Sequence, residues 1–147
     1  MNSPYNHEHP RIKKPIGYRL SLPMRHLCYG DTSVTYYRGP QVVTTEKTGP
    51  TTYTLTYAAD SVGARGLVLK APVCPVAEEY CGAAPFELYD LGSGSWVPAE
   101  AVKVSDNVLK VTAPTASSVS SIRYLHAGWT VPIVFNSKGF PQAPFEP

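Results

Sequence analysis

The feature that most constrains the fold is an alternation of large apolar and small polar residues over residues 51–58. Successive side chains of a β-strand point to opposite faces, so Tyr53, Leu55 and Tyr57 would share one face. The threonines between them would occupy the other face, which is typical of a half-buried antiparallel strand. The other runs expected to form strands are residues 33–37, 66–70, 86–89, 101–104, 108–112, 122–125 and 133–135.

Turn signals separate these runs at short intervals. The 147 residues include 15 prolines, 11 glycines and 10 tyrosines, and only 16% are charged. This balance favours short strands joined by turns over a helical bundle. Ser105-Asp106-Asn107 is expected to be a hairpin turn between two strands. The sequence therefore predicts a mainly β fold, an antiparallel β-sandwich, with a proline-rich tail extended over its surface.

One helical pattern precedes the strands, over residues 10–29. Its apolar residues recur at steps of four, four and three, and would share one face: Ile16, Leu20, Met24 and Leu27. Gly30 is expected to end the helix in a left-handed conformation, and Pro23 to kink or split it. The apolar face must dock on the sandwich, meet another copy of the chain or stay exposed.

His9 stands directly before Pro10 and a basic segment. Proline suits the first helical position, because its φ is preset and its missing N–H would be unpaired there. The imidazole of His9 is therefore expected at a rigid helix N-terminus, where a general base could be held. Two alternatives stay open, a solvated histidine and a metal site with His7 and Glu8, although zinc needs more ligands than these.

Charge and hydropathy argue against several classes of function. The net charge of +2 is small and no dense Lys/Arg run exists, so nucleic acid is not an expected partner. No apolar run approaches the roughly 20 residues of a membrane span, and residues 1–10 lack the apolar region of a signal peptide. No motif calls for a cofactor or a metal, and we expect neither.

The three cysteines divide into a close pair and a single residue. Cys74 and Cys81 are near enough in sequence for a loop disulfide, but two free thiols are an equal alternative, since the compartment decides. Cys28 lies in the apolar helical pattern and is expected to be an inert buried thiol.

Short blocks of residues occur in a fixed order from about Asn6 to the last residue. They are His9-Pro10-Arg11, Tyr18-Arg19-Leu20, Tyr29-Gly30, Gly39-Pro40, Phe86-Glu87-Leu88, Trp96-Val97-Pro98-Ala99, Ile122-Arg123-Tyr124, Trp129 to Pro132, Asn136-Ser137-Lys138-Gly139-Phe140-Pro141 and Ala143-Pro144-Phe145. Taken together, they resemble the C-terminal part of the sialate O-acetylesterases, which are SGNH-type carbohydrate esterases.

The resemblance implies a chemistry. Members of this family remove O-acetyl groups from sialic acid and related sugars, with a serine nucleophile and a histidine base in an α/β/α lobe. The histidine comes from an Asp-x-x-His motif at the start of that lobe's last helix, and His9 takes its position. In such reactions the histidine accepts the serine proton, a carboxylate orients the histidine, and backbone or Asn donors stabilise the oxyanion.

This chain departs from the family pattern in two respects. Asn6 stands where the family has aspartate, and an amide stabilises an imidazolium less well. The family nucleophile lies far upstream of its histidine, whereas eight residues precede His9 here. The segments Gly30-Asp31-Thr32-Ser33 and Gly92-Ser93-Gly94-Ser95 are interpreted as turns and not as nucleophile sites. We therefore expect the nucleophile to lie outside this chain, which alone would be inactive, whether as a fragment, a subunit or a degenerate gene product.

Several aromatic and basic residues have alternative interpretations. Trp96 and Trp129, with the tyrosines, could form a sugar-stacking platform, but filling the core and its edges is favoured. Arg123 could bind an acidic group of the hydrolase lobe or a sugar carboxylate, and a structural ion pair is favoured. His126 is expected in a surface loop.

The resulting interpretation divides the chain at residue 30. Residues 1–30 would be the C-terminal helix segment of a hydrolase lobe, and residues 31–147 a β-sandwich accessory domain. The expected partners are an O-acetylated sugar in the complete enzyme, and either a separate hydrolase lobe or another copy. The family is typically lysosomal, secreted or periplasmic, but no compartment is assigned. The alternative is a non-catalytic β-sandwich that binds carbohydrate or packs against a protein.

Overall fold

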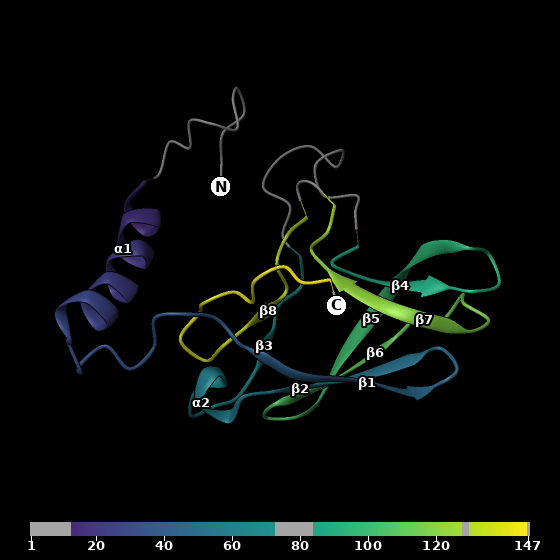
Figure 1. Cartoon of the computed structure of the whole chain (residues 1–147), viewed down its shortest axis with the longest axis horizontal. Coiled ribbons are helices and arrows are strands. Elements are labelled where there is room, and N and C mark those ends of the chain that lie inside the picture. Colours follow the sequence, from purple (N-terminus) through teal and green to yellow (C-terminus); the bar gives the residue numbers. More distant parts are fainter. Residues whose placement is uncertain (1–12, 73–83, 128–129, 147) are drawn as a thin grey trace.

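The computed structural model of this chain describes residues 13–72, 84–127 and 130–146 (Figure 1). A helix precedes two antiparallel sheets, which confirms the predicted mainly β fold. The elements are α1 (Lys14–Pro23), the π-helical turn η1 (Met24–Cys28), β1 (Val42–Gly49), β2 (Thr52–Tyr57), α2 (Ala59–Val62), β3 (Val68–Leu69), β4 (Phe86–Asp90), β5 (Ser95–Ser105), β6 (Val108–Thr112), β7 (Val119–Tyr124) and β8 (Val134–Phe135). The functional division at residue 30 stays a prediction.

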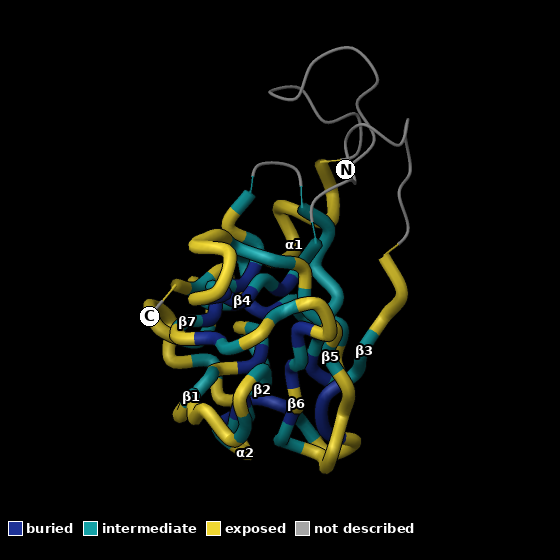
Figure 2. The backbone as a smooth tube through the Cα atoms, turned by 90° about the vertical axis from the view of Figure 1, so that its right-hand side faces the viewer, coloured by how far each residue is buried: buried dark blue, intermediate teal, exposed yellow. Residues whose placement is uncertain are grey.

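The larger sheet has the strand order β1-β2-β6-β5-β4-β7, and β3 pairs with β8 in a smaller sheet. In the larger sheet the long strand β5 joins two halves, because residues 95–99 pair with β4 and residues 100–105 pair with β6. One apolar core includes side chains from both halves and from β8. Figure 2 shows the buried residues concentrated in the strands, whereas α1 is largely exposed.

The predicted strands are present, except for the one over residues 33–37. In β2 the side chains of Tyr53, Leu55 and Tyr57 are buried, as expected. The turn between β5 and β6 also lies where it was predicted. The edge strand β1 was missed, because it pairs only with β2 and its mostly exposed side chains need no apolar alternation.

The strand predicted over residues 33–37 is wrong. This segment is irregular and takes part in neither sheet, although Val34 is buried. The proline-rich tail is extended but is not merely a surface segment. Phe145 pairs with Tyr124 and Pro141 with Phe135 through single β-bridges, and the buried hydroxyl of Tyr57 donates a 2.7 Å hydrogen bond to Gln142 Oε1.

The helix differs from its prediction at its start, whereas Pro23 splits it as expected. It begins at Lys14 and not at Pro10, and Pro15 occupies its first turn. After Pro23, which has no N–H to continue the α-helical ladder, the backbone changes to the π-helical turn. Gly30 has the expected left-handed conformation, with a φ of 64°. Cys28 is exposed, contrary to its prediction, because it lies beside an apolar helix face that no described residue covers.

Candidate functional site

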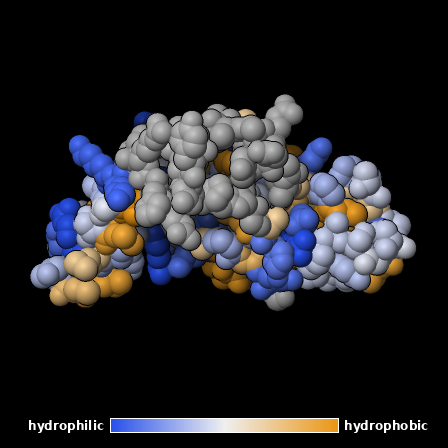
Figure 3. All heavy atoms as spheres, turned by 90° about the horizontal axis from the view of Figure 1, so that it is seen from above, coloured by the Kyte–Doolittle hydropathy of each residue, from blue (hydrophilic) through white to orange (hydrophobic). Residues whose placement is uncertain are grey.

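The helical segment formed by α1 and η1 exposes most of its apolar side chains. Figure 3 shows hydrophobic side chains at the left of the molecule, where this segment lies. The exposed fractions are 37% for Ile16, 66% for Leu20, 56% for Met24 and 67% for Leu27. We call these four residues the apolar stripe. Leu22, in contrast, is only 6% exposed, and at about 100° per residue it lies on the opposite side of the helix.

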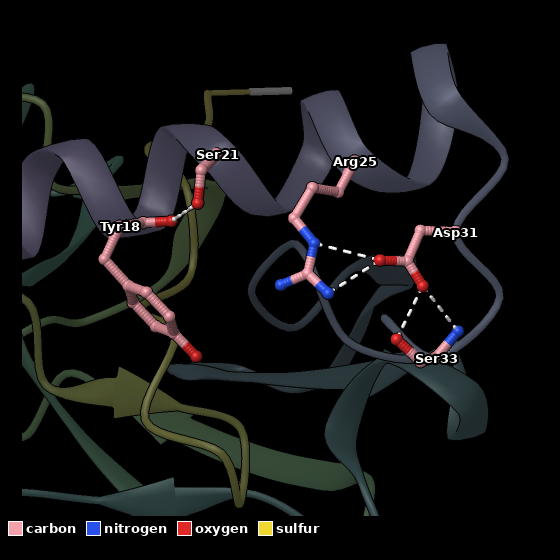
Figure 4. A network of polar contacts seen from close by, with 5 residues as sticks. All are labelled: Tyr18, Ser21, Arg25, Asp31 and Ser33. Carbon is pink, nitrogen blue, oxygen red and sulfur yellow. Dashed lines mark hydrogen bonds and ion pairs between the residues drawn. The ribbon is translucent and has the colours of Figure 1, made fainter.

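A polar network fixes the end of the helix to the following segment (Figure 4). Arg25 donates from Nε and Nη2 to Asp31 Oδ2, at 2.9 and 2.6 Å. The other carboxylate oxygen of Asp31 accepts hydrogen bonds from the backbone N–H and the hydroxyl of Ser33. Ser21 Oγ also donates to the Tyr18 carbonyl oxygen, inside the helix. Gly30-Asp31-Thr32-Ser33 is therefore a capping turn, which supports its interpretation from the sequence.

The same contacts set the charge of Asp31. Hydrogen bonds from the Ser33 and Arg25 side chains lower the pKa of Asp31 from 3.8 to about 2. Because these contacts favour the ionised carboxylate, the ion pair with Arg25 persists well below neutral pH. The guanidinium of Arg25 is thus held in one orientation over a wide pH range.

The segment over residues 33–41 lines three depressions in succession. The largest has a volume of about 500 Å³ and lies between α1, the start of this segment and the turn at Lys138–Phe140. We call it the basic groove, because its cationic side chains come from Arg19, Arg25 and Lys138. A smaller pocket of about 210 Å³ contains His26, which stacks on Tyr37 at 4.3 Å between ring centroids.

The residues predicted to carry the ester chemistry lie outside the described residues. These are His9 and Asn6, and Cys74, Cys81 and Trp129 are outside them as well. Their roles stay predictions. The helix α1 begins at Lys14, with Lys13 as its N-cap, and not at Pro10 as predicted. In the sequence, His9 is five positions before the first residue of α1.

The described serines Ser33, Ser61 and Ser93 do not form a nucleophile site. The Ser33 hydroxyl donates to Asp31, and the Ser61 hydroxyl donates to the Ala58 carbonyl oxygen. Gly92-Ser93-Gly94-Ser95 includes the β4–β5 turn, where the Ser93 backbone N–H donates to Asp90. Over residues 13–72, 84–127 and 130–146 there is no cluster of metal-ligating side chains and no helix that could span a membrane.

Trp96 does not offer an open stacking surface. The guanidinium of Arg123 lies 4.2 Å from its ring centroid, and Tyr89 packs edge-on against it at 5.5 Å. Arg123 Nε also donates to Glu87 at 2.9 Å, between side chains that are 14% and 17% exposed. The favoured structural ion pair of Arg123 is thereby confirmed. His126 is exposed, as expected, and its Nδ1 lies 2.9 Å from Glu146.

No protein-family model matches this chain, and no curated protein does at a significant level. The chain is similar to the crystal structure of a novel carbohydrate acetylesterase from Xanthomonas citri, with a TM-score of 0.69 and 21% sequence identity. This chain therefore shares the fold of part of that protein. The similarity covers 95% of this chain but 29% of the Xanthomonas protein, so this chain spans less than a third of that enzyme.

Proposed function

We propose that this chain is the C-terminal part of a carbohydrate esterase that hydrolyses O-acetyl esters on sugars. The observation that carries this proposal is the fold, since almost the whole chain superposes on a fraction of an acetylesterase. The ordered sequence blocks that resemble sialate O-acetylesterases support it independently. On this proposal, the serine nucleophile belongs to a hydrolase lobe outside these 147 residues.

The apolar stripe supports the existence of that lobe. In a helix of a soluble domain, the more apolar face normally packs against the core. In α1 and the following turn η1, the face with Ile16, Leu20, Met24 and Leu27 is exposed instead. Covering these partly exposed side chains would contribute on the order of 5 kcal/mol. The sheet of a hydrolase lobe is the partner that the resemblance implies for this helix.

Within the complete enzyme, we propose that His9 acts as the general base. It would accept the hydroxyl proton of the serine as the serine attacks the acetyl carbonyl, and return a proton to the departing sugar oxygen. Water would then hydrolyse the acetyl-enzyme with His9 as base again. Asn6 would orient the imidazole through a hydrogen bond. The sequence blocks favour sialic acid or a related sugar as the substrate.

The test uses the coding sequence upstream of Met1. An in-frame segment with a nucleophile serine should yield a longer protein that releases acetate from O-acetylated sialic acid and hydrolyses 4-nitrophenyl acetate. His9→Ala should lower kcat of that protein by at least about a thousandfold, and His7→Ala is the matched control. Robust turnover by the 147-residue chain alone, unchanged by His9→Ala, contradicts the proposal.

A non-catalytic binding role, the alternative, has one structural support of its own. The basic groove combines cations and aromatic rings in a concave surface. Its composition is that of a binding site and does not depend on any nucleophile.

A further inference from the structure

The basic groove carries three cationic side chains and no carboxylate among the described residues that line it. Arg19 and Arg25 come from the helical segment and Lys138 from the turn after β8. Lys138 is far from the two arginines in the sequence, and the fold brings all three to one concavity. The Asp31 carboxylate offsets the charge of Arg25, with which it pairs, so Arg19 and Lys138 supply the excess positive charge. The local field therefore favours an anion, although the net charge of the whole chain is only +2.

Arg25 is preorganised for binding. Its Nε and Nη2 are both directed to one oxygen of Asp31, and Ser33 holds the other oxygen. The remaining terminal nitrogen takes part in neither contact. Figure 4 shows this nitrogen on the side of Arg25 where the Tyr18 ring descends from the helix. A guanidinium held in this way loses little side-chain entropy when it binds a carboxylate.

Aromatic rings line the same groove. Tyr18, Tyr36 and Phe140 are among its lining residues, and Lys138 Nζ lies 5.9 Å from the centroid of the Tyr36 ring. Aromatic rings pack well against the apolar C–H faces of sugars, and tyrosine hydroxyls can form hydrogen bonds with the hydroxyl groups of the sugar. A simple inorganic anion has no apolar face that could pack against these rings. A long polyanion would require a denser basic surface.

We propose that the basic groove binds a carboxylated sugar unit of an acidic glycan. The carboxylate would lie between Arg19 and Arg25, with Lys138 beside it, and the sugar ring against Tyr18 and Tyr36. A volume of about 500 Å³ suits roughly two sugar rings, since ligand sites of drug-sized molecules occupy about 300–1,000 Å³. This binding is independent of the ester chemistry, because none of these residues is part of the proposed catalytic pair.

The test is a calorimetric or NMR titration of the full chain with trigalacturonate. Its methyl ester keeps the rings and removes the charge, and triglutamate keeps the charge and removes the rings. We expect trigalacturonate to bind more tightly than either. Arg19→Gln and Lys138→Gln should each weaken its binding about three- to tenfold, as expected for partly exposed charged contacts. Tyr18→Ala should weaken it to a similar degree.

Lys110→Gln is the matched control, because Lys110 is an exposed cation on β6, outside the groove. It should leave trigalacturonate binding unchanged. Equal binding of trigalacturonate and triglutamate, with Tyr18→Ala without effect, would show attraction of charge alone and overturn the proposal. Absence of binding at millimolar ligand overturns it as well. The titration involves no ester hydrolysis. A negative titration therefore does not contradict the proposed esterase function, and loss of the esterase proposal does not contradict sugar binding by the basic groove.

Discussion

At the scale of single residues, Asn136 connects segments that are distant in the sequence. Its side chain is 1% exposed, and its Nδ2 donates to the carbonyl oxygens of Arg38 and Ser61. Its Oδ1 accepts from the backbone N–H groups of Lys138 and Phe140. The amide thus uses its full hydrogen-bonding capacity. The block that begins at Asn136 resembles an esterase motif, but this residue's contacts are structural and not catalytic.

Asn136→Ala should therefore be strongly destabilising. The substitution removes the Asn136 partner of two carbonyl oxygens, that of Ser61 being buried, and of two N–H groups. The expected cost is about 2–4 kcal/mol in the free energy of unfolding. Asn107→Ala removes one hydrogen bond to the Tyr57 carbonyl oxygen and should cost about 1 kcal/mol. Urea unfolding followed by circular dichroism measures both. Equal losses in the two variants would show that Asn136 has no special role.

Glycines provide a second comparison at this scale. A Cβ on Gly39 would lie 1.8 Å from the Pro141 carbonyl oxygen, whereas one on Gly17 would meet no atom within 4 Å. Gly39→Ala should destabilise the fold by about 1–3 kcal/mol through overpacking. Gly17→Ala, inside a helix, should be neutral or stabilising by up to about 1 kcal/mol. Thermal unfolding distinguishes the two, and a stable Gly39→Ala variant would mean that the tail does not pack on this segment.

At the scale of elements, the strands that could be predicted from the sequence are those whose alternate side chains are buried. Strand β2 could be predicted because its alternate side chains enter the core, and the β5–β6 hairpin because its turn residues lie between two apolar runs. The edge strand β1 carries no such signal. The basic groove could not be predicted, since only the tertiary structure brings Lys138 to α1. His9 was predicted from its position before Pro10 and from the family resemblance, and Asn6 from the resemblance alone; their roles are still to be tested.

Asp90 couples the β4–β5 turn to the segment before β7. Hydrogen bonds from the Ser118 backbone and the Ser93 side chain, together with contacts to Ser117, lower the pKa of Asp90 well below its usual value. A lowered folded-state pKa means that its stabilising effect is complete above about pH 4 and is lost as the pH falls below that value. Asp90→Asn should therefore flatten the decrease in stability below pH 4.

The measurement is the urea midpoint from pH 6 down to the lowest pH at which unfolding is reversible. Asp106→Asn is the control, because Asp106 is exposed at the β5–β6 turn and contacts Lys103. If Asp90→Asn and the wild-type chain lose stability in parallel over this range, Asp90 does not supply the acid-sensitive contact. The turn would then owe its stability to the backbone hydrogen bonds alone.

At the scale of the whole molecule, the apolar stripe offers a test of the proposed hydrolase lobe. If a hydrolase lobe covers α1, Leu20→Ser with Leu27→Ser should barely affect the isolated chain, where both leucines are exposed. In the longer protein the same pair should destabilise by about 2–4 kcal/mol, because each polar replacement would be buried. Val102→Ser with Val104→Ser is the matched control, since these valines are 62% and 63% exposed on β5. Denaturant unfolding of both proteins measures these effects on stability. Sedimentation velocity excludes self-association through the apolar stripe. Equal effects of the two pairs in the longer protein would mean that the lobe does not lie against α1.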